Sequence, residues 1–457
     1  MRARAALLLA ALALLGPRAS AQVGLAFNRP GSGARAAGMA NAFIAVSDDG
    51  TAASWNPAGL GQLRKPELSI VSSTIGRSIV AQGYRTRDDL ATFTPTRSSY
   101  QGTYLDFASL AVPVSLWGKA VTFQGSWRRL YALDYREVVS TTREPLVPEG
   151  PPPTRIDIND DLVGGVDLLS FAGALRLTRR VAIGGSVNFW RGDWKEDVWT
   201  SETLLVAPGG TGYLTTSQTS RVRGDNFSVG LMLTYPRFSV GLVHQGALHS
   251  DFSATANATA SGTTEAPRQS AQGSLRFPRT FGLGGAWRPA ERWTVALDFT
   301  WDEWKSAELD TPETGRINFL DGLPPDRTSS RNTTSVNAGA EHLFLGAGYV
   351  IPLRFGAAWE PQGARDPYTR DAVNFVMLAF GTGYNTNSLK LDAAFQYRWA
   401  RFQTGADFGG LTESQPELPS AVGEQESKEW RLKLSLIFRV TDTAKLHRTL
   451  GKVFGGG

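Results

Sequence analysis

The sequence predicts an all-β fold, namely a 14-stranded antiparallel transmembrane β-barrel with an N-terminal plug, or hatch. Long segments alternate apolar and polar residues, as strands with one lipid-facing side do. Short and long connections alternate between these segments, which is typical of barrels with turns at one end and loops at the other. No apolar run long enough for a membrane-spanning helix follows the N-terminal stretch, so helical membrane proteins are excluded.

The composition narrows the function classes. The chain has 457 residues, no Cys, four scattered His residues and a net charge of +5 without a basic stripe. These features argue against thiolate metal sites, cysteine nucleophiles and nucleic-acid binding. His244 and His249 lie on one predicted strand and point to opposite faces, and no Ser lies in a nucleophile elbow. We therefore expect no enzyme activity, no catalytic or metal site and no cofactor.

The first 21 residues predict a signal peptide. Arg2 and Arg4 precede an apolar stretch, 5–15, and residues 19–21 (Ala-Ser-Ala) provide a small-residue cleavage site. The apolar stretch is too short for a permanent membrane helix, with an uncleaved anchor as the alternative. We expect export and a mature chain of 22–457.

Residues 22–65 predict the plug. Gly and Ala dominate 31–43, and Asn56-Pro57 followed by Gly59 marks a tight turn. A barrel of this width encloses more space than its own side chains fill, and small residues let the backbone pack closely against the wall. A tail in the periplasm is the alternative.

Residues 66–440 predict the barrel. On Trp430–Val440 the even positions are apolar and most odd positions are polar, and the same alternation recurs along the chain with aromatic residues near the strand ends. A soluble β-sandwich also alternates, but its strands are usually shorter. The predicted strands are 67–83, 104–116, 120–139, 161–177, 180–199, 222–235, 238–255, 274–287, 292–305, 334–345, 350–360, 372–385, 388–402 and 429–440.

Several charged residues fall on the predicted inward faces and should line a polar lumen rather than form a catalytic site. They are Asp298, Asp302, Lys390, Asp392, Arg398, Arg431 and Lys433. Residues 441–457 follow the last strand and predict a basic periplasmic tail, with a disordered end as the alternative.

Four stretches resemble a known family. Gly33–Phe43, followed by Trp55-Asn56-Pro57-Ala58-Gly59-Leu60, resembles the N-terminal hatch of the FadL/TodX family of outer-membrane transport proteins. Ile351–Pro361 and Leu391–Arg398 are similar to late strands of that family. By this resemblance Phe43, Trp55, Asn56, Pro57 and Ala58 belong to the hatch, with the last three forming its turn.

The resemblance implies a function in the bacterial outer membrane. The protein would passively take up hydrophobic small molecules, such as long-chain fatty acids or hydrocarbons, through an apolar pocket, hatch movement and a lateral exit. It would be a monomer in contact with outer-membrane lipid and lipopolysaccharide. A PorV-like barrel of a secretion system and a polar-solute porin are the alternatives. The sequence assigns no substrate-binding residues.

The resemblance also implies an inward kink in the third strand, 120–139. An Arg facing the middle of the bilayer costs about 2–4 kcal/mol in barrels, so unbroken alternation through Arg128-Arg129 is not expected. We predict a bulge or kink between Gly125 and Arg129, because Gly within a strand often marks one. The alternative places Arg129 near the lipid headgroups.

The predicted loops offer few apolar residues for a landing site. The segments 200–221 and 256–273 are largely polar, although the family's corresponding loops form a greasy groove. The most apolar loop elements are instead Ile317, Phe319 and Leu320, together with the Pro-rich 144–153.

Overall fold

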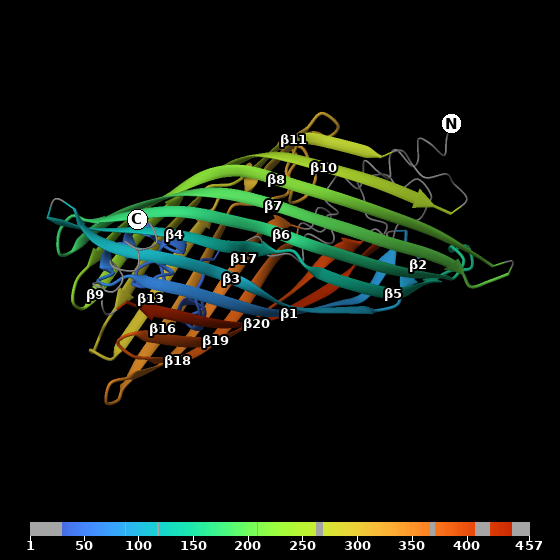
Figure 1. Ribbon diagram of the computed structural model, residues 1–457. Coiled ribbons are helices and arrows are strands. Elements are labelled where there is room, and N and C mark those ends of the chain that lie inside the picture. The colour runs from blue at the N-terminus through green and yellow to red at the C-terminus, as the bar shows by residue number, and fades with distance from the viewer. Residues whose placement is uncertain are drawn as a thin grey trace, which may run out of the picture.

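The computed structural model describes residues 30–86, 88–116, 118–207, 209–261, 268–365, 371–406 and 421–440. The predicted signal peptide (1–21), the start of the predicted plug (22–29) and the C-terminal tail (441–457) lie outside these ranges. Figure 1 shows the described chain as one long barrel of tilted strands. No helix within these ranges combines the length and the apolar character that crossing a bilayer requires.

The elements follow one another along the chain as mostly long strands. The strands are β1 (Glu67–Thr86), β2 (Ala91–Phe93), β3 (Thr96–Leu116), β4 (Lys119–Ala132), β5 (Tyr135–Pro145), β6 (Thr154–Arg176), β7 (Val181–Leu204), β8 (Gly210–Thr234), β9 (Phe238–Gln245), β10 (Leu248–Ala260), β11 (Gln269–Phe277), β12 (Thr280–Trp287), β13 (Trp293–Asp302), β14 (Glu308–Thr311), β15 (Gly315–Ile317), β16 (Thr333–Leu345), β17 (Val350–Arg365), β18 (Ala372–Asn385), β19 (Leu389–Ala406) and β20 (Ala421–Arg439). The helical segments are α3 (Ala34–Gly38), η1 (Ala52–Ser54), η2 (Pro57–Gln62) and η3 (Trp304–Ser306).

Fourteen of these strands form a closed antiparallel ring, which confirms the predicted barrel. Their order around the wall is β1, β3, β4, β6, β7, β8, β9, β12, β13, β16, β17, β18, β19 and β20. The ring closes because β20 pairs with β1 along nearly its whole length, from Glu67–Arg439 to Thr86–Ala421. Each ring strand corresponds to one predicted segment, and β5, β10, β11 and β14 extend the wall.

Three predicted strands are each divided in two, and one of them, 120–139, becomes β4 and β5. The segment 238–255 becomes β9 and β10, and 274–287 becomes β11 and β12, which are separated by Pro278-Arg279. Proline has no backbone N–H to donate to the ladder. Opposite it, the carbonyl of Gly246 accepts from the side chain of Asn226 at 2.8 Å. The wall therefore bends at this height and keeps its order of strands.

The outer face carries an apolar belt. Its most exposed side chains include Phe123, Phe171, Phe227, Leu283, Phe355, Leu378 and Leu434. So much exposed apolar surface indicates contact with lipid. Between β4 and β10 the belt ends at outward charges that lie opposite one another in register, namely Arg129, Asp167, Arg191, Arg223 and Asp251. Strands β6 to β8 continue past this row, which makes them longer than predicted.

Residues 30–65, which we call the hatch segment, lie inside the ring and are mostly buried (Figure 1). The carboxylate of Asp298 accepts from the backbone N–H of Phe43 at 2.6 Å and of Ile44 at 2.7 Å. Asn337 donates its side-chain N–H to the carbonyl of Ala40 at 2.8 Å. Inward polar residues of the wall thus satisfy backbone groups of a segment that has little regular structure of its own.

Glycines of the wall allow the hatch backbone to approach. A Cβ added at Gly356 would lie 2.5 Å from the carbonyl carbon of Met39 and 2.6 Å from the nitrogen of Ala40. Both atoms belong to backbone and cannot rotate away. The small inward residues of β17 are therefore needed for the hatch segment to fit.

Replacing Gly356 with Val is expected to displace the hatch segment and to destabilise the protein by about 1–3 kcal/mol, the usual cost of overpacking. Limited proteolysis of the N-terminal part and thermal unfolding in detergent would show this. Gly285→Val is the matched control, because the nearest atom to an added Cβ there lies 4.0 Å away. Equal protease resistance in both variants would contradict the close fit.

Candidate functional site

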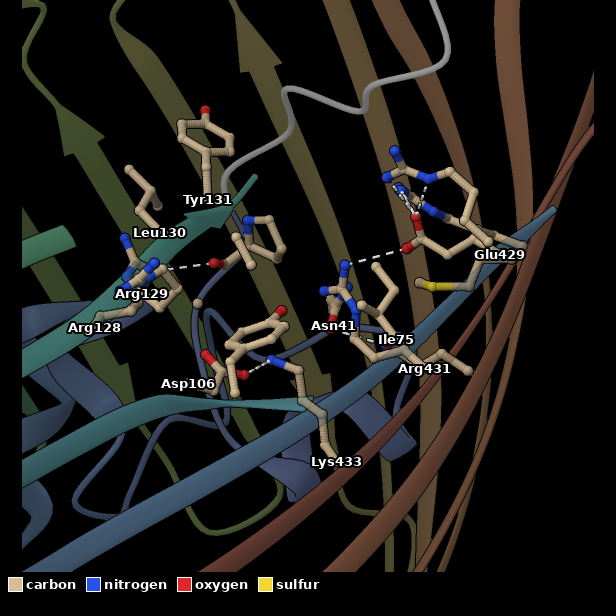
Figure 2. Close-up of a pocket in the computed structure, with 18 of the residues that line it drawn as sticks. Asn41, Ile75, Asp106, Arg128, Arg129, Leu130, Tyr131, Glu429, Arg431 and Lys433 are labelled. Atoms are coloured by element: carbon tan, nitrogen blue, oxygen red, sulfur yellow. Dashed lines mark hydrogen bonds and ion pairs between the residues drawn. The ribbon is translucent and has the colours of Figure 1, made fainter. Parts of the chain in front are cut away.

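A cavity of about 100 Å³ lies between the hatch segment and the wall (Figure 2). The hatch segment contributes Pro30, Gly31 and Asn41 to its lining. The remaining lining comes from β1, β3 and β4 and from β17 to β20. The cavity is therefore bounded by strands on both sides of the β1–β20 pairing, which closes the barrel.

One part of the lining is a cluster of charges centred on Glu429. Its carboxylate accepts from Arg77 at 2.9 Å, from Arg398 at 2.7 Å and from Arg431 at 3.2 Å. The Nε atoms of Arg398 and Arg431 are buried without a hydrogen-bond partner. The guanidinium groups at Glu429 therefore outnumber the carboxylates, and donors remain free.

A second ion pair in the lining joins Lys433 to Asp106, at 2.5 Å. Glu429, Arg431 and Lys433 are alternate residues of β20, so all three point into the lumen. The predicted inward charges are confirmed here: Lys433, Asp298, Asp302, Lys390 and Asp392 are buried, and Arg398 and Arg431 are largely so. Counting Arg128 but not Arg129, five cations and three carboxylates line the cavity.

The other part of the lining is apolar and continues into a large aromatic cluster. Leu130 and Tyr131 line the cavity and pack against this cluster. Its rings include Phe277, whose centroid lies 6.1 Å from Tyr131, 5.6 Å from Trp190 and 4.9 Å from Phe319. The site thus joins a basic region to an apolar one.

The loop after β13 forms much of this cluster. Ile317, Phe319 and Leu320, the residues expected to be the most apolar loop elements, are buried with Trp304 inside the barrel. They do not form an exposed landing surface. Folding inward removes their apolar area from water, worth about 25 cal/mol per Å². The Pro-rich 144–153 stays largely exposed.

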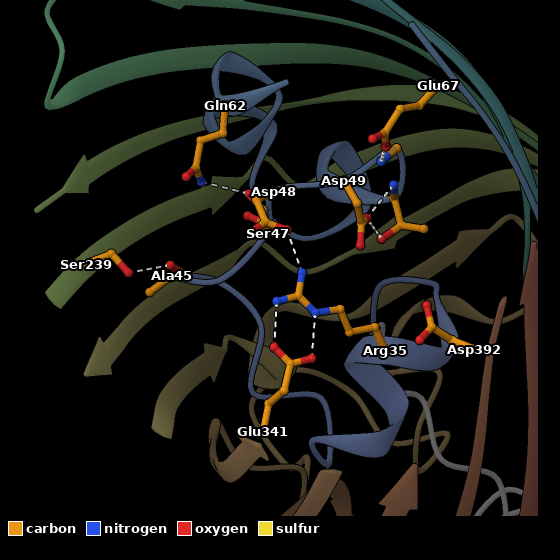
Figure 3. A network of polar contacts seen from close by, with 12 residues as sticks. Arg35, Ala45, Ser47, Asp48, Asp49, Gln62, Glu67, Ser239, Glu341 and Asp392 are labelled. Atoms are coloured by element: carbon orange, nitrogen blue, oxygen red, sulfur yellow. Dashed lines mark hydrogen bonds and ion pairs between the residues drawn. The ribbon is translucent and has the colours of Figure 1, made fainter. Parts of the chain in front are cut away.

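An ion network fastens the hatch segment to the wall (Figure 3). Arg35 donates to both carboxylate oxygens of Glu341, at 3.1 and 2.9 Å, and to Asp48 at 2.5 Å. Arg354, whose side chain is fully buried, joins Glu341 at 2.7 Å to Asp392 at 2.8 Å. Burial alone would lower the pKa of Arg35, but Asp48 and Glu341 raise it well above its ordinary value. The guanidinium therefore stays charged.

The predicted hatch residues contact one another and the wall of the barrel. Phe43 and Trp55 meet edge to face with centroids 5.9 Å apart. Asn56 caps η2 by accepting from the N–H of Ala58 at 3.1 Å, and it donates to the carbonyl of Leu231 at 3.1 Å. Pro57 fits against the wall at Gly184, where an added Cβ would clash with it. Trp55 also lines a second cavity of about 70 Å³.

The third strand is irregular, but further along than predicted. Gly125 pairs regularly with Leu110 and Phe171. The predicted bulge between Gly125 and Arg129 is therefore wrong in its position. The pairing with β6 shifts between Arg129 and Tyr131, and β4 ends at Ala132. The physical reason lies on the neighbouring strand β6.

Gly164 of β6 faces the break with a φ of 127°, a conformation that side chains oppose. Its N–H donates to the carboxylate of Asp134 at 2.9 Å and its carbonyl accepts from Leu133 at 3.1 Å. Arg128 points inward and donates to the carbonyl of Pro30 at 3.0 Å. Arg129 points outward to Asp167 at 2.6 Å, at the edge of the apolar belt.

The irregularity leaves a seam in the wall. The pairing of β3 with β4 ends at Phe107–Arg128, although β3 continues to Thr96. Over that stretch β3 pairs with β1 alone among the described strands. At the far end of the seam, Thr94 is hydrogen-bonded to Thr141 and Thr142 of β5. The seam therefore lies beside Leu130–Leu133 of the cavity.

Sequence reasoning missed the residues that join distant segments. Arg35 and Arg354 were visible only as isolated cations in otherwise apolar stretches. Arg77 and Glu429 carried no sign of a common site. An inward-facing Arg among small residues was the single available signal, and it did not identify a partner.

No family model and no curated protein matches the sequence. Among solved structures, the chain is similar to a Pseudomonas aeruginosa FadL homologue, at 15% identity and a TM-score of 0.65, over 91% of this chain and 100% of that one. It is also similar to the P. putida toluene transporter TodX, at 16% identity and a TM-score of 0.54, over 91% and 100% of the two chains. For the Ralstonia pickettii toluene transporter TbuX the values are 15%, 0.50, 90% and 99%. These likenesses show a FadL/TodX-type fold, as the resemblance implied.

Proposed function

We propose that this chain, with its FadL/TodX-type fold, is a passive transporter of hydrophobic compounds in the bacterial outer membrane. The apolar belt supports the membrane location, and the similar solved structures include toluene transporters. The observation that carries the proposal is the position of the cavity. It adjoins the hatch segment, the aromatic cluster and the seam between β3 and β4.

The proposed path runs sideways. A ligand would pass the aromatic cluster, occupy the cavity and leave through the seam at the edge of the apolar belt, with movement of the hatch segment enlarging the cavity. Burying apolar surface is worth about 25 cal/mol per Å², so an apolar path holds such a ligand where a water-filled pore does not. A lateral exit avoids returning that surface to water.

The lining favours an anionic amphiphile, such as a long-chain fatty acid, over a neutral hydrocarbon. The cations around Glu429 outnumber the carboxylates, and the buried Nε atoms of Arg398 and Arg431 have no partner. A carboxylate would satisfy such donors through charge-assisted hydrogen bonds. The adjoining Leu130 and Tyr131 would receive the beginning of the apolar chain.

The double change Arg431→Gln and Lys433→Gln is expected to weaken palmitate binding by about tenfold or more, because charge-assisted hydrogen bonds are worth about 1.5–3 kcal/mol. Toluene binding should not change. Titration calorimetry in detergent would measure both. Arg401→Gln is the control, because Arg401 is exposed and pairs with Glu424. Equal losses for palmitate and toluene would contradict a carboxylate site.

Mass spectrometry of apolar molecules retained by gently purified protein tests the function as a whole. We expect fatty acids or hydrocarbons to be retained and little steady conductance in planar bilayers. A large steady conductance with only detergent bound would favour a polar-solute porin, against which the buried hatch segment argues. Co-purifying partner proteins without uptake would favour a PorV-like barrel.

A further inference from the structure

Nine Lys and Arg side chains gather at the turn end of the barrel, and we call them the basic rim. They are Arg64, Lys65, Lys119, Arg176, Arg179, Arg180, Arg237, Arg288 and Arg292. Because neighbouring ring strands are antiparallel, the turns that carry them and the start of β1 lie at the same end. Seven of the nine are exposed, and Arg176 and Arg288 are half-buried.

No carboxylate among the described residues pairs with the basic rim. The hydrogen bonds that its members make go to neutral oxygens: Lys119 to the carbonyl of Leu177 at 3.4 Å, Arg176 to that of Arg179 at 3.2 Å, and Arg288 to Ser239 at 3.5 Å. This contrasts with the loop end, where exposed cations such as Arg221 and Arg316 are paired with carboxylates. The charge of the rim is therefore available to a partner.

The rim covers only one side of the barrel. In the turns from β3–β4 to β12–β13, Glu291 is the sole acidic residue. The turns 346–349 and 386–388 on the opposite side, Gly-Ala-Gly-Tyr and Thr-Asn-Ser, carry no charge. Such an uneven distribution indicates a specific contact rather than a general requirement for solubility.

Exposed aromatic side chains border the rim on its membrane side. Arg237 precedes Phe238, Arg288 follows Trp287 and Arg292 precedes Trp293, and these three rings face outward. Arg180 lies 4.9 Å from the ring of Tyr235, which stacks on Phe238 at 4.5 Å. Aromatic rings in this position sit at the level of lipid headgroups. The adjacent cations therefore lie at the level of the phosphates.

We infer that the basic rim binds the headgroups of anionic phospholipids, such as phosphatidylglycerol, in the leaflet at the turn end of the barrel. The inference rests on the membrane location proposed above but not on the transported ligand. Unpaired cations complement phosphate charge, and the aromatic border fixes their height. Anionic lipid would gather under β4 to β13 and not under β17 to β19.

Spin-labelled lipids in bilayers of equal parts phosphatidylglycerol and phosphatidylcholine would test this. Around the wild-type protein we expect phosphatidylglycerol to associate about fivefold more strongly, and raising NaCl from about 0.05 to 0.5 M should remove most of that preference. The variant with Arg179, Arg180, Arg237 and Arg292 each changed to Gln should show nearly equal association. The control changes four cations near the loop end, Arg155, Lys195, Arg221 and Arg316, to Gln.

Three results would overturn the inference: a preference that survives in the rim variant, a preference lost equally in the control, and a wild-type preference that salt does not weaken. Loss of polyglutamate binding in the rim variant, with lipid preference retained, would point instead to an acidic protein and also overturn it. The salt series needs no variant, so it decides even where the rim variant fails to fold. Fatty-acid retention is measured in the same samples and tests the proposed transport function separately. Loss of the lipid preference with fatty acid still retained therefore counts against the lipid-binding inference alone.

Discussion

Joining Ser98→Cys to Glu137→Cys with a short cleavable cross-linker is expected to lower ligand uptake at least about tenfold, with recovery after the linker is reduced. The two side chains face each other across the seam, where the hydroxyl of Ser98 donates to the carboxylate of Glu137. No ladder joins β3 to β5 at this point among the described strands, so the seam can widen without breaking one. The chain has no Cys of its own, so the linker has a single pair of targets.

The control for this experiment cross-links a part of the wall that should not open. Lys195 and Thr219 lie directly opposite each other on β7 and β8, which pair over their full length. Cross-linking Lys195→Cys to Thr219→Cys should leave uptake unchanged. Binding of the ligand should persist in both cross-linked proteins, because neither pair of cross-linked residues lines the cavity. Undiminished uptake with the seam closed would mean that the ligand leaves elsewhere, for example past the hatch segment.

Glu341→Gln is expected to destabilise the protein by about 1–3 kcal/mol and to loosen the hatch segment. Removing this carboxylate leaves Arg354, with an exposed fraction of 0%, and Arg35 without their shared partner. Arg35 keeps Asp48 and Arg354 keeps Asp392, but the buried N–H groups that faced Glu341 lose a charged acceptor, and a buried donor without a good acceptor is destabilising. Thermal unfolding in detergent measures the first effect, and planar-bilayer conductance the second.

Two further variants separate loosening of the hatch segment from damage to the barrel. Arg35→Met removes the hatch side of the network but leaves Glu341 paired with Arg354, so conductance should rise while the barrel loses less stability. Glu303→Gln breaks an exposed pair with Arg279 and should cost less than about 1 kcal/mol. A Glu341→Gln protein as stable and as tightly closed as the Glu303→Gln protein would contradict the role of the network.

The positions of the strands could be predicted because alternation is a local property. On β20 the apolar residues Trp430, Leu432 and Leu434 had to face lipid, and this placed Glu429, Arg431 and Lys433 in the lumen. The divisions of β9–β10 and β11–β12 were missed because alternation continues across them. Pro278 was the visible signal for the second division.

The candidate site was predicted only in part. The hatch segment and the residues of its turn were expected, and they lie inside the ring. The irregularity of the third strand was placed too early because Gly125 drew attention, whereas the conformation that interrupts pairing belongs to Gly164 on the neighbouring strand. The outward Arg129 did not require a kink, since Asp167 lies opposite it in register.

The sequence by itself determined which residues face lipid and which face the lumen, and how many strands the ring contains, because a period of two and the lengths of connections are read along the chain. Only the tertiary structure decided that Arg35 meets Glu341, 306 positions away, and that Arg77 and Arg398 share Glu429. Such partners follow from strand register and from the curvature of the closed ring. Both are set by all the strands together, and no single segment contains them.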